Sequence, residues 1–399
     1  MLSAVKDARG RIFLTLCIMG IFAILSSTMS KNPVLKFFAS SLETPEGFWT
    51  GFIASASTIP GILVSLPAAS LSDILGRRKI LLASAVVFAS APFLYLAITL
   101  WWQLALVRFY HGFATAIFVP VTEASIAELF PARRGERISL LASATAMGRG
   151  IAPFLGGYIL FATSYSYHSL YLAVGIAGVT AFITSIPFLA GKTRPVIQPS
   201  TPQKTLKRMV HGWRIIAGNP SILVTSLVQA SQYYTYGAVE YFLVGYLTDI
   251  AQLDALRIGI IMGSQIIAVI LAKPFAGRIS DKIGRRAPII AGSTVSILPL
   301  FVIHFSTRFS VLLLLSVIYG IGFAMVTSST PALVSDLAPM KLTGTAMGFL
   351  DMTMDIGQTI GPLITGMILA TNLAYAGSFS ALAAVLLGSC IVFVLSKVA

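Results

Sequence analysis

The chain has 399 residues, of which 56% are hydrophobic and only 11% are charged. Soluble domains carry about 25% charged residues, so this chain has too few to cover a water-soluble globule. Many apolar stretches reach the length that crosses a hydrocarbon core of ~30 Å as a helix. The composition therefore excludes a soluble globule and predicts an all-α membrane protein with many spans.

The formal net charge of +14 is the kind of excess that nucleic-acid-binding proteins carry. Here the basic residues lie in short gaps between apolar spans, and not on one face or tail, so we expect no nucleic-acid partner. The two cysteines, Cys17 and Cys390, lie inside apolar spans without metal-ligand spacing. The sequence therefore predicts no metal and no cofactor.

Clusters of charged residues, proline and glycine divide the chain into twelve expected spans. Lys6, Arg9 and Arg11 precede the first span as in a signal peptide. That span is too long and lacks a small-residue cleavage site, so we interpret it as a retained helix. In chain order the expected spans are 12–38, 48–70, 80–99, 103–129, 138–162, 168–190, 221–248, 256–277, 287–305, 309–334, 343–369 and 373–396.

Lysine and arginine are distributed unequally between the two sides of these spans. The side that holds the amino end carries 21 of the 28 basic residues, and the opposite loops carry 4. Because cytoplasmic loops are enriched in basic residues, both termini are predicted to be cytoplasmic. We expect this topology in the cell (cytoplasmic or inner) membrane.

The only long polar stretch, residues 191–219, separates six spans from six spans. The sequence thus predicts an N-terminal six-helix bundle at 1–190, a cytoplasmic basic linker at 191–219 and a C-terminal six-helix bundle at 220–399. Residues 206–216 suit an amphipathic helix on the anionic inner leaflet. They equally suit a segment whose charges only set the topology.

A charged motif occurs twice in this apolar chain. "LSDILGRRK" covers 71–79, and "ISDKIGRRA" covers 279–287, 208 residues later. At nearly the same offset, "GRGIAPFLGG" at 148–157 is matched by "GQTIGPLITG" at 357–366. Repetition at a fixed offset indicates duplicated units, so we expect two pseudo-symmetric bundles around a central site.

The repeated charged motif and two repeated acids suggest a gate at the cytoplasmic surface. A carboxylate there can hold an arginine or cap a helix amino terminus. One such lock in each half would form in one conformation and break in the other. The alternative is that the arginines only orient the chain in the membrane. The gate candidates are Asp73, Gly76, Arg77, Arg78, Asp281, Gly284, Arg285 and Arg286, with Glu128 and Asp336 as the acids.

The glycine-rich stretch at 148–157 lies within an expected span. Gly148, Gly156 and Gly157 would let two helices approach closely, and Pro153 would bend the helix. Ordinary packing of small residues explains the same pattern.

Ionisable residues inside spans are costly in a bilayer and are therefore candidates for function. Asp355 lies twelve residues into its span, roughly 18 Å deep at ~1.5 Å per residue, and is the first choice for a proton carrier. The alternative is that these residues form structural salt bridges, for example between Arg149 and Asp351 or Asp355. The ionisable residues singled out in this way are Asp355, Arg108, Asp351, Glu240 and Arg149, and the acids among them are candidates for proton coupling.

Aromatic residues with polar tips suit a wet cavity that accepts amphipathic molecules. They also suit the aromatic belt at the membrane surface. The candidates for such a substrate cavity are Tyr233, Tyr236, Gln232 and His111.

The repeated loop motif, "RFYHGFATA" at 108–116 and the glycine-rich motif at 148–157 resemble the major facilitator superfamily. The closest resemblance is to its twelve-helix drug:proton antiporter branch, and it covers essentially the whole chain. The resemblance implies transport by alternating access, gating by the loop motif, and a role for Arg108 in proton coupling. It also implies that the glycine-rich motif favours export. His111 departs from the pattern, since glutamine is usual there.

The expected function is proton-coupled secondary transport, with export of small amphipathic organic compounds by proton antiport. The expected partners are a small-molecule substrate, protons and the lipid bilayer, and the protein is expected to be a monomer. Two alternatives stay open: a proton-driven symporter that imports a metabolite or sugar, and a non-transporting receptor or assembly factor. No enzyme is predicted, because "AGKT" at 190–193 lacks the first glycine of a phosphate loop and no zinc or serine-nucleophile pattern occurs.

Overall fold

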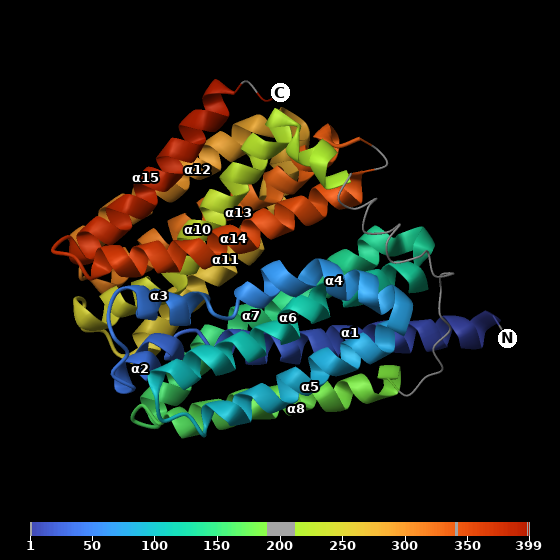
Figure 1. Ribbon diagram of the computed structural model, residues 1–399, viewed down its shortest axis with the longest axis horizontal. Coiled ribbons are helices and arrows are strands. Elements are labelled where there is room, and N and C mark those ends of the chain that lie inside the picture. The colour runs from blue at the N-terminus through green and yellow to red at the C-terminus, as the bar shows by residue number, and fades with distance from the viewer. Residues whose placement is uncertain (1, 190–211, 340–341, 397, 399) are drawn as a thin grey trace. The chain divides into compact units, whose positions relative to one another are not determined.

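The computed structural model describes residues 2–189, 212–339, 342–396 and 398. Within these ranges the regular elements are helices, and no strand occurs (Figure 1). The first half contains α1 (Leu2–Met29), α2 (Val34–Ser41), α3 (Phe48–Ser55), α4 (Ile59–Leu75), α5 (Arg77–Tyr95), α6 (Trp101–Leu129), the 3-10 turn η1 (Pro131–Arg133), α7 (Arg134–Ala162) and α8 (Tyr167–Leu189). The second half contains α10 (Pro220–Asp249), α11 (Ala255–Ile283), α12 (Arg286–Val302), η2 (Ile303–Phe305), α13 (Phe309–Leu337), α14 (Thr343–Leu369) and α15 (Ala374–Leu395).

Nine helices in the described ranges are long and apolar enough to cross a membrane, or ten if α3 and α4 form one broken span. Helices α10 and α14 have 30 and 27 residues but are not among the nine. They carry polar groups such as Gln232, Glu240 and Asp355, which lower their hydropathy. The protein is therefore a multi-pass helical membrane protein, and the count of twelve spans stays a prediction.

The first two expected spans are each interrupted in the structure. The range 12–38 contains the end of α1 at Met29 and the start of α2 at Val34. Pro33 lies in this break, where it lacks the N–H group that would continue a helical ladder. The range 48–70 breaks between α3 and α4, and Pro60 occupies the first turn of α4, a position that proline favours.

The helices group into two compact units. Unit 1 comprises Met1–Glu43 and Ala56–Pro199, and unit 2 comprises Thr44–Ser55 and Ser200–Ala399. In this division α3 groups with unit 2. Its Gly51 lies against the backbone of Pro362 in α14, which explains the grouping.

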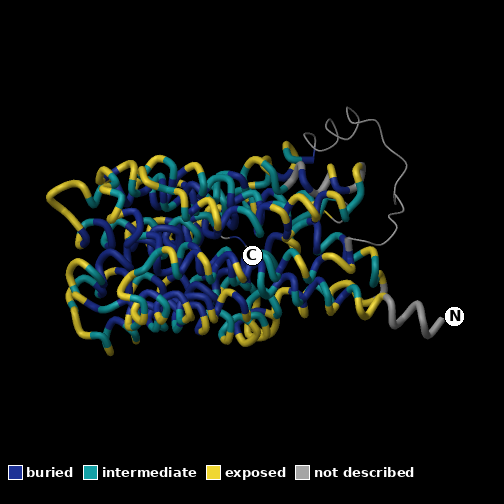
Figure 2. Tube along the Cα trace, turned by 90° about the horizontal axis from the view of Figure 1, so that it is seen from below, coloured by how far each residue is buried: buried dark blue, intermediate teal, exposed yellow. Residues whose placement is uncertain are grey.

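Unit 1 is held by α1 against α7 and α8, and by α5 against α6 and α8. Large side chains such as Leu16, Phe88 and Phe118 form its core and are fully buried. Along the helices of the chain, buried positions are interspersed with intermediate and exposed ones (Figure 2). A side chain at Gly148 of α7 would overlap the carbonyl oxygen of Ile21 in α1, so these two backbones are in contact.

Unit 2 repeats this arrangement with α10 against α14, while α13 packs between α11 and α12. A side chain at Gly357 would overlap the carbonyl oxygen of Ala230, and one at Gly361 would overlap that of Tyr234. Glycine is therefore required at these α14 positions by the close approach of α10.

The expected linker at 191–219 lies largely outside the described residues, which resume at 212. Of the helix expected at 206–216, residues 212–216 are described and are helical. The ring of Trp213 lies 6.1 Å from that of Phe349 in α14, and Ile216 is buried in the same cluster. The end of this segment therefore packs onto unit 2.

Substitution of Gly361 by alanine is expected to lower the melting temperature and the yield of folded protein, because the new methyl group must push α10 and α14 apart. The matched control is Gly388→Ala in α15, where a Cβ atom meets nothing within 4 Å. That change is expected to be neutral or slightly stabilising, since alanine favours helix by about 1 kcal/mol over glycine. Thermal unfolding in detergent measures both. Equal melting temperatures for the two variants would contradict the close contact.

Candidate functional site

The loop between α4 and α5 forms an ion pair with the end of α6. Gly76 separates the two helices with φ of +94°, a conformation that favours glycine. Arg77 follows it, and its Nε and Nη2 atoms lie 3.0 and 2.7 Å from Oε1 of Glu128. Arg77 also donates to the hydroxyl of Ser72. Of the two arginines in this loop, Arg77 is thus the one that pairs with the repeated acid.

The second copy of the motif repeats this geometry between α11 and α12. Gly284 has φ of +88°, and Nε of Arg285 lies 3.1 Å from Oδ2 of Asp336 at the end of α13. Arg285 also donates to Asp281. These hydrogen bonds to carboxylates raise the pKa of the Arg285 guanidinium above its ordinary value, so it stays cationic.

The second arginine of each motif contacts the last helix of its own half. The guanidinium of Arg78 lies 5.4 Å from the ring centroid of Phe188 in α8. Arg286 donates to the carbonyl oxygens of Val394 and Val398, at 2.7 and 3.1 Å, at the end of α15. A cation near a helix carboxyl terminus is favourable, so Arg286 also stabilises the end of α15.

The ion pairs formed by the gate candidates therefore each lie within one unit. The Arg77–Glu128 pair belongs to unit 1, and the Arg285–Asp336 pair belongs to unit 2. Asp73 lies in α4, but its side chain is outside the described part of the structure. Opening and closing of these pairs stays a prediction.

A buried arginine lies in α6 of unit 1. Arg108 is 2% exposed, and its Nη2 atom donates to the hydroxyl of Ser57 at 2.7 Å, in the break between α3 and α4. One turn along α6, Nδ1 of His111 lies 3.4 Å from the hydroxyl of Tyr95 and 3.5 Å from that of Ser30. His111, expected in a substrate cavity, is 3% exposed in the interior of unit 1.

Ser57 and Tyr95 were not among the residues expected from the sequence. Isolated serine and tyrosine residues carry no pattern in an apolar chain. The sequence therefore carried no signal that would have identified Ser57.

Two acids lie one turn apart on α14 in unit 2. Asp351 is exposed and Asp355 is half-buried. Among the described residues of unit 2, neither carboxylate takes part in a hydrogen bond or a salt bridge. Two carboxylates at this spacing repel each other when both are ionised, so the site favours binding of a cation or proton.

Glu240 and Arg149 complete the ionisable residues singled out from the sequence. Glu240 is half-buried in α10 of unit 2. Arg149 is exposed on α7 and belongs to unit 1, whereas the α14 acids belong to unit 2. A salt bridge between Arg149 and these acids stays a prediction.

The aromatic residues expected in the substrate cavity gather between α10 and α13. Tyr236 stacks on Phe323 with ring centroids 4.8 Å apart, and Tyr233 lies 5.1 Å from the same ring. Gln232 is fully buried, and its side-chain amide has no hydrogen-bond partner among the described residues. This part of unit 2 therefore combines aromatic surface with an unsatisfied polar group.

The chain is similar to known transporters along most of its length. The archaeon Methanocaldococcus jannaschii has an uncharacterised MFS-type transporter that is 24% identical, and the match covers 89% of this chain and 91% of the relative. A multi-drug resistance efflux pump PmrA homolog of Lactococcus lactis is 25% identical over 89% of this chain and 87% of the relative. The multidrug resistance protein MdtG of Enterobacter lignolyticus is 25% identical, and the match covers 94% of this chain and 89% of the relative.

Solved structures show the same fold at lower identity. A bacterial homolog of the human lysosomal transporter Spinster, in an inward-facing and occupied conformation, has a TM-score of 0.80 at 15% identity and covers 98% of this chain and 97% of its own. The nucleoside transporter NupG has a TM-score of 0.79 at 14% identity, and the match covers 97% of this chain and 100% of the NupG chain.

The sequence pattern described as the Major Facilitator Superfamily matches residues 12–250 and 225–398. These two matches together span nearly the whole chain, as do the relatives and the fold. The chain belongs to the Major Facilitator Superfamily and is a membrane transporter, not an enzyme.

Proposed function

We propose that this transporter exports small amphipathic organic compounds across the cell membrane in exchange for protons, by alternating access. Its twelve spans would place both termini in the cytoplasm, as the distribution of basic residues predicts. The observation that carries the proposal is the pair of acids on α14, Asp351 and Asp355, which lack a counter-charge among the described residues of unit 2. Relatives named as multidrug efflux pumps support the direction of transport.

The two acids suit exchange of a proton for a cationic or amphipathic compound. Repulsion between the ionised carboxylates is relieved when either a proton or a cation binds, so the two ligands compete. Asp351 is exposed on α14, which we expect to span the membrane, and a carboxylate in that position requires contact with water. We assign Asp355 as the proton carrier and Asp351 as its partner, with Glu240 as the next candidate.

Arg108 is proposed to set the charge balance in unit 1. Its guanidinium is buried and held by Ser57, so it keeps a fixed position. Arg149 adds a second positive charge on α7. In this scheme the coupling cations lie in one unit and the coupling acids in the other.

The ion pairs of the loop motif are proposed to form the cytoplasmic gate. Each fastens a loop to the end of a helix in its own half, through Arg77–Glu128 and Arg285–Asp336. The four side chains are 16–58% exposed, so each pair contributes at most about 1 kcal/mol. Contacts of that strength can break and re-form in every transport cycle.

The substrate is proposed to bind beside the aromatic cluster of Tyr233 and Tyr236, where Gln232 offers hydrogen bonds. His111 is retained as a candidate from unit 1. Uptake of a polar metabolite by proton symport is the second candidate, since a solved transporter with the same fold is named for nucleosides.

Asp355→Asn is expected to abolish proton-linked transport, because asparagine cannot carry a proton. Purified protein in liposomes, with an imposed proton gradient and an internal pH dye, is tested with lipophilic cations, weak acids and sugars. The control is Asp254→Asn, where asparagine can still accept the hydrogen bond at the start of α11. A compound that discharges the gradient with wild type and the control, but not with Asp355→Asn, supports the assignment.

Equal discharge by wild type and Asp355→Asn would show that another residue carries the proton, and Glu240 would be tested next. Movement of the compound in the same direction as the proton would favour symport over antiport. If no compound in the panel responds, the efflux proposal fails.

Removing both gate acids, by Glu128→Gln with Asp336→Asn, is expected to lower the transport rate about tenfold, equivalent to 1.4 kcal/mol. The melting temperature should change by only a few degrees, because the pairs are partly exposed. Glu136→Gln is the control, since Glu136 lies 4.0 Å from Arg133 and both are exposed. Normal transport by the double variant would mean that the loop arginines only orient the chain.

A further inference from the structure

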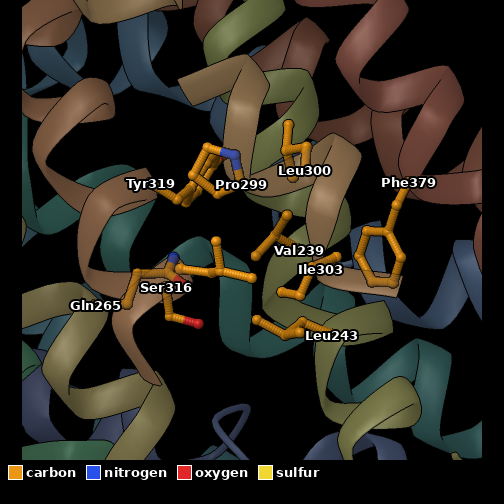
Figure 3. Close-up of a pocket in the computed structure, with 10 residues that line it drawn as sticks. Val239, Leu243, Gln265, Pro299, Leu300, Ile303, Ser316, Tyr319 and Phe379 are labelled. Carbon is orange, nitrogen blue, oxygen red and sulfur yellow. The ribbon is translucent and has the colours of Figure 1, made fainter. Parts of the chain in front are cut away.

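Unit 2 contains a small pocket among α10, α11, α12, α13 and α15, with a volume of about 10 Å³. That is about the space that one water molecule needs. Gln265, Ser316 and Tyr319 lie together on one side of it, and Phe379 lies on the opposite side (Figure 3). The remaining wall is apolar.

Two polar atoms at this pocket lack hydrogen bonds within the described residues. They are Oε1 of Gln265, which is 1% exposed, and Oγ of Ser316, which is 2% exposed. The hydroxyl of Tyr319 lies 3.0 Å from Oγ1 of Thr235. Buried polar groups in native proteins are nearly always satisfied, by protein or by ordered water. The Gln265 oxygen therefore requires a donor.

The pocket is the repeat counterpart of the Arg108 site in unit 1. At the 208-residue offset, Ser57 corresponds to Gln265 and Arg108 corresponds to Ser316. The backbone agrees with this correspondence. A side chain at Gly112 would overlap the carbonyl oxygen of Ser57, and one at Gly320, also 208 residues later, would overlap that of Gln265.

The two sites differ in the group that can donate a hydrogen bond to the residue at position 57 or 265. In unit 1 the guanidinium of Arg108 donates to Ser57. In unit 2 the serine at position 316 has a short side chain with one hydroxyl and no cationic donor. Ser316 therefore cannot supply Gln265 with the guanidinium donor that Arg108 supplies to Ser57.

We infer that this pocket binds one water molecule, which donates to Oε1 of Gln265 and shares a second hydrogen bond with the hydroxyl of Ser316. The water takes the place that the Arg108 guanidinium has in unit 1. One half of the transporter therefore holds a fixed cation at this position, and the other holds an exchangeable neutral donor. A metal cation fits less well, because the pocket offers three neutral oxygens and hard cations take about six or more.

The test measures thermal unfolding of the purified, full-length protein for Gln265→Leu, Ser316→Ala and the double variant. Each single change is expected to lower the melting temperature by about 2 °C, because it removes one partner of the water and strands the other. The double variant should lose less than the two single losses combined, since both residues bind the same water. Ser143→Ala, on an exposed position of α7, is the control and should be neutral.

A higher melting temperature for Gln265→Leu would overturn the inference, because replacing an unsatisfied amide in a dry pocket stabilises a protein. The inference would also be overturned if sodium chloride, compared with choline chloride, raised the melting temperature of wild type but not of Ser316→Ala. That result would indicate that the pocket binds a sodium ion. If the variants do not fold, high-resolution density of the wild-type protein decides. A peak within hydrogen-bonding distance of both oxygens supports the water, and its absence contradicts it.

Discussion

The backbones of α10 and α14 touch at Gly357 and Gly361, and the candidate site residues Asp351, Asp355 and Gln232 lie on these two helices. Lipid tails provide little hydrophobic drive for helices to associate, so close van der Waals packing must hold such a pair together. Small residues at these positions leave the polar side chains of the same helices free for other uses. The acids of α14 and the polar aromatic residues of α10 are thereby carried on two helices locked to each other. Gly148 provides the corresponding contact between α1 and α7 in unit 1.

The two halves share a skeleton but differ in the ionisable residues at some equivalent interior positions. Both copies of the loop motif pair an arginine with an acid 51 residues later along the chain. In the interior the repeat has diverged. Arg108 has Ser316 as its counterpart, and at the offset that relates Gly148 to Gly357, alanines 142 and 146 stand opposite Asp351 and Asp355. The duplicated scaffold therefore carries different ionisable residues at equivalent interior positions of its two halves.

Much of this architecture was predictable because membrane helices follow simple rules. Apolar length indicated the spans, and the 208-residue repeat located the loop motifs that the structure shows in equivalent ion pairs. Breaks within spans were missed, because Pro33 and Pro60 are tolerated in membrane helices and do not by themselves mark an end. The choice of Arg77 over Arg78 was also not predictable, since adjacent arginines have the same chemistry and only the turn at Gly76 directs them. Hydrogen-bond partners such as Ser57 depend on packing between distant segments, which sequence periodicity does not record.

The central claim is that the acids of α14 exchange protons against the transported compound. The most direct measurement is the proton balance of the purified protein in weakly buffered detergent solution, when a compound that discharges the gradient in liposomes is added. Wild type is expected to release protons on binding, whereas Asp355→Asn is expected to release none, although it still binds the compound. Equal proton release by both proteins, or binding by wild type without any proton release, would contradict the claim.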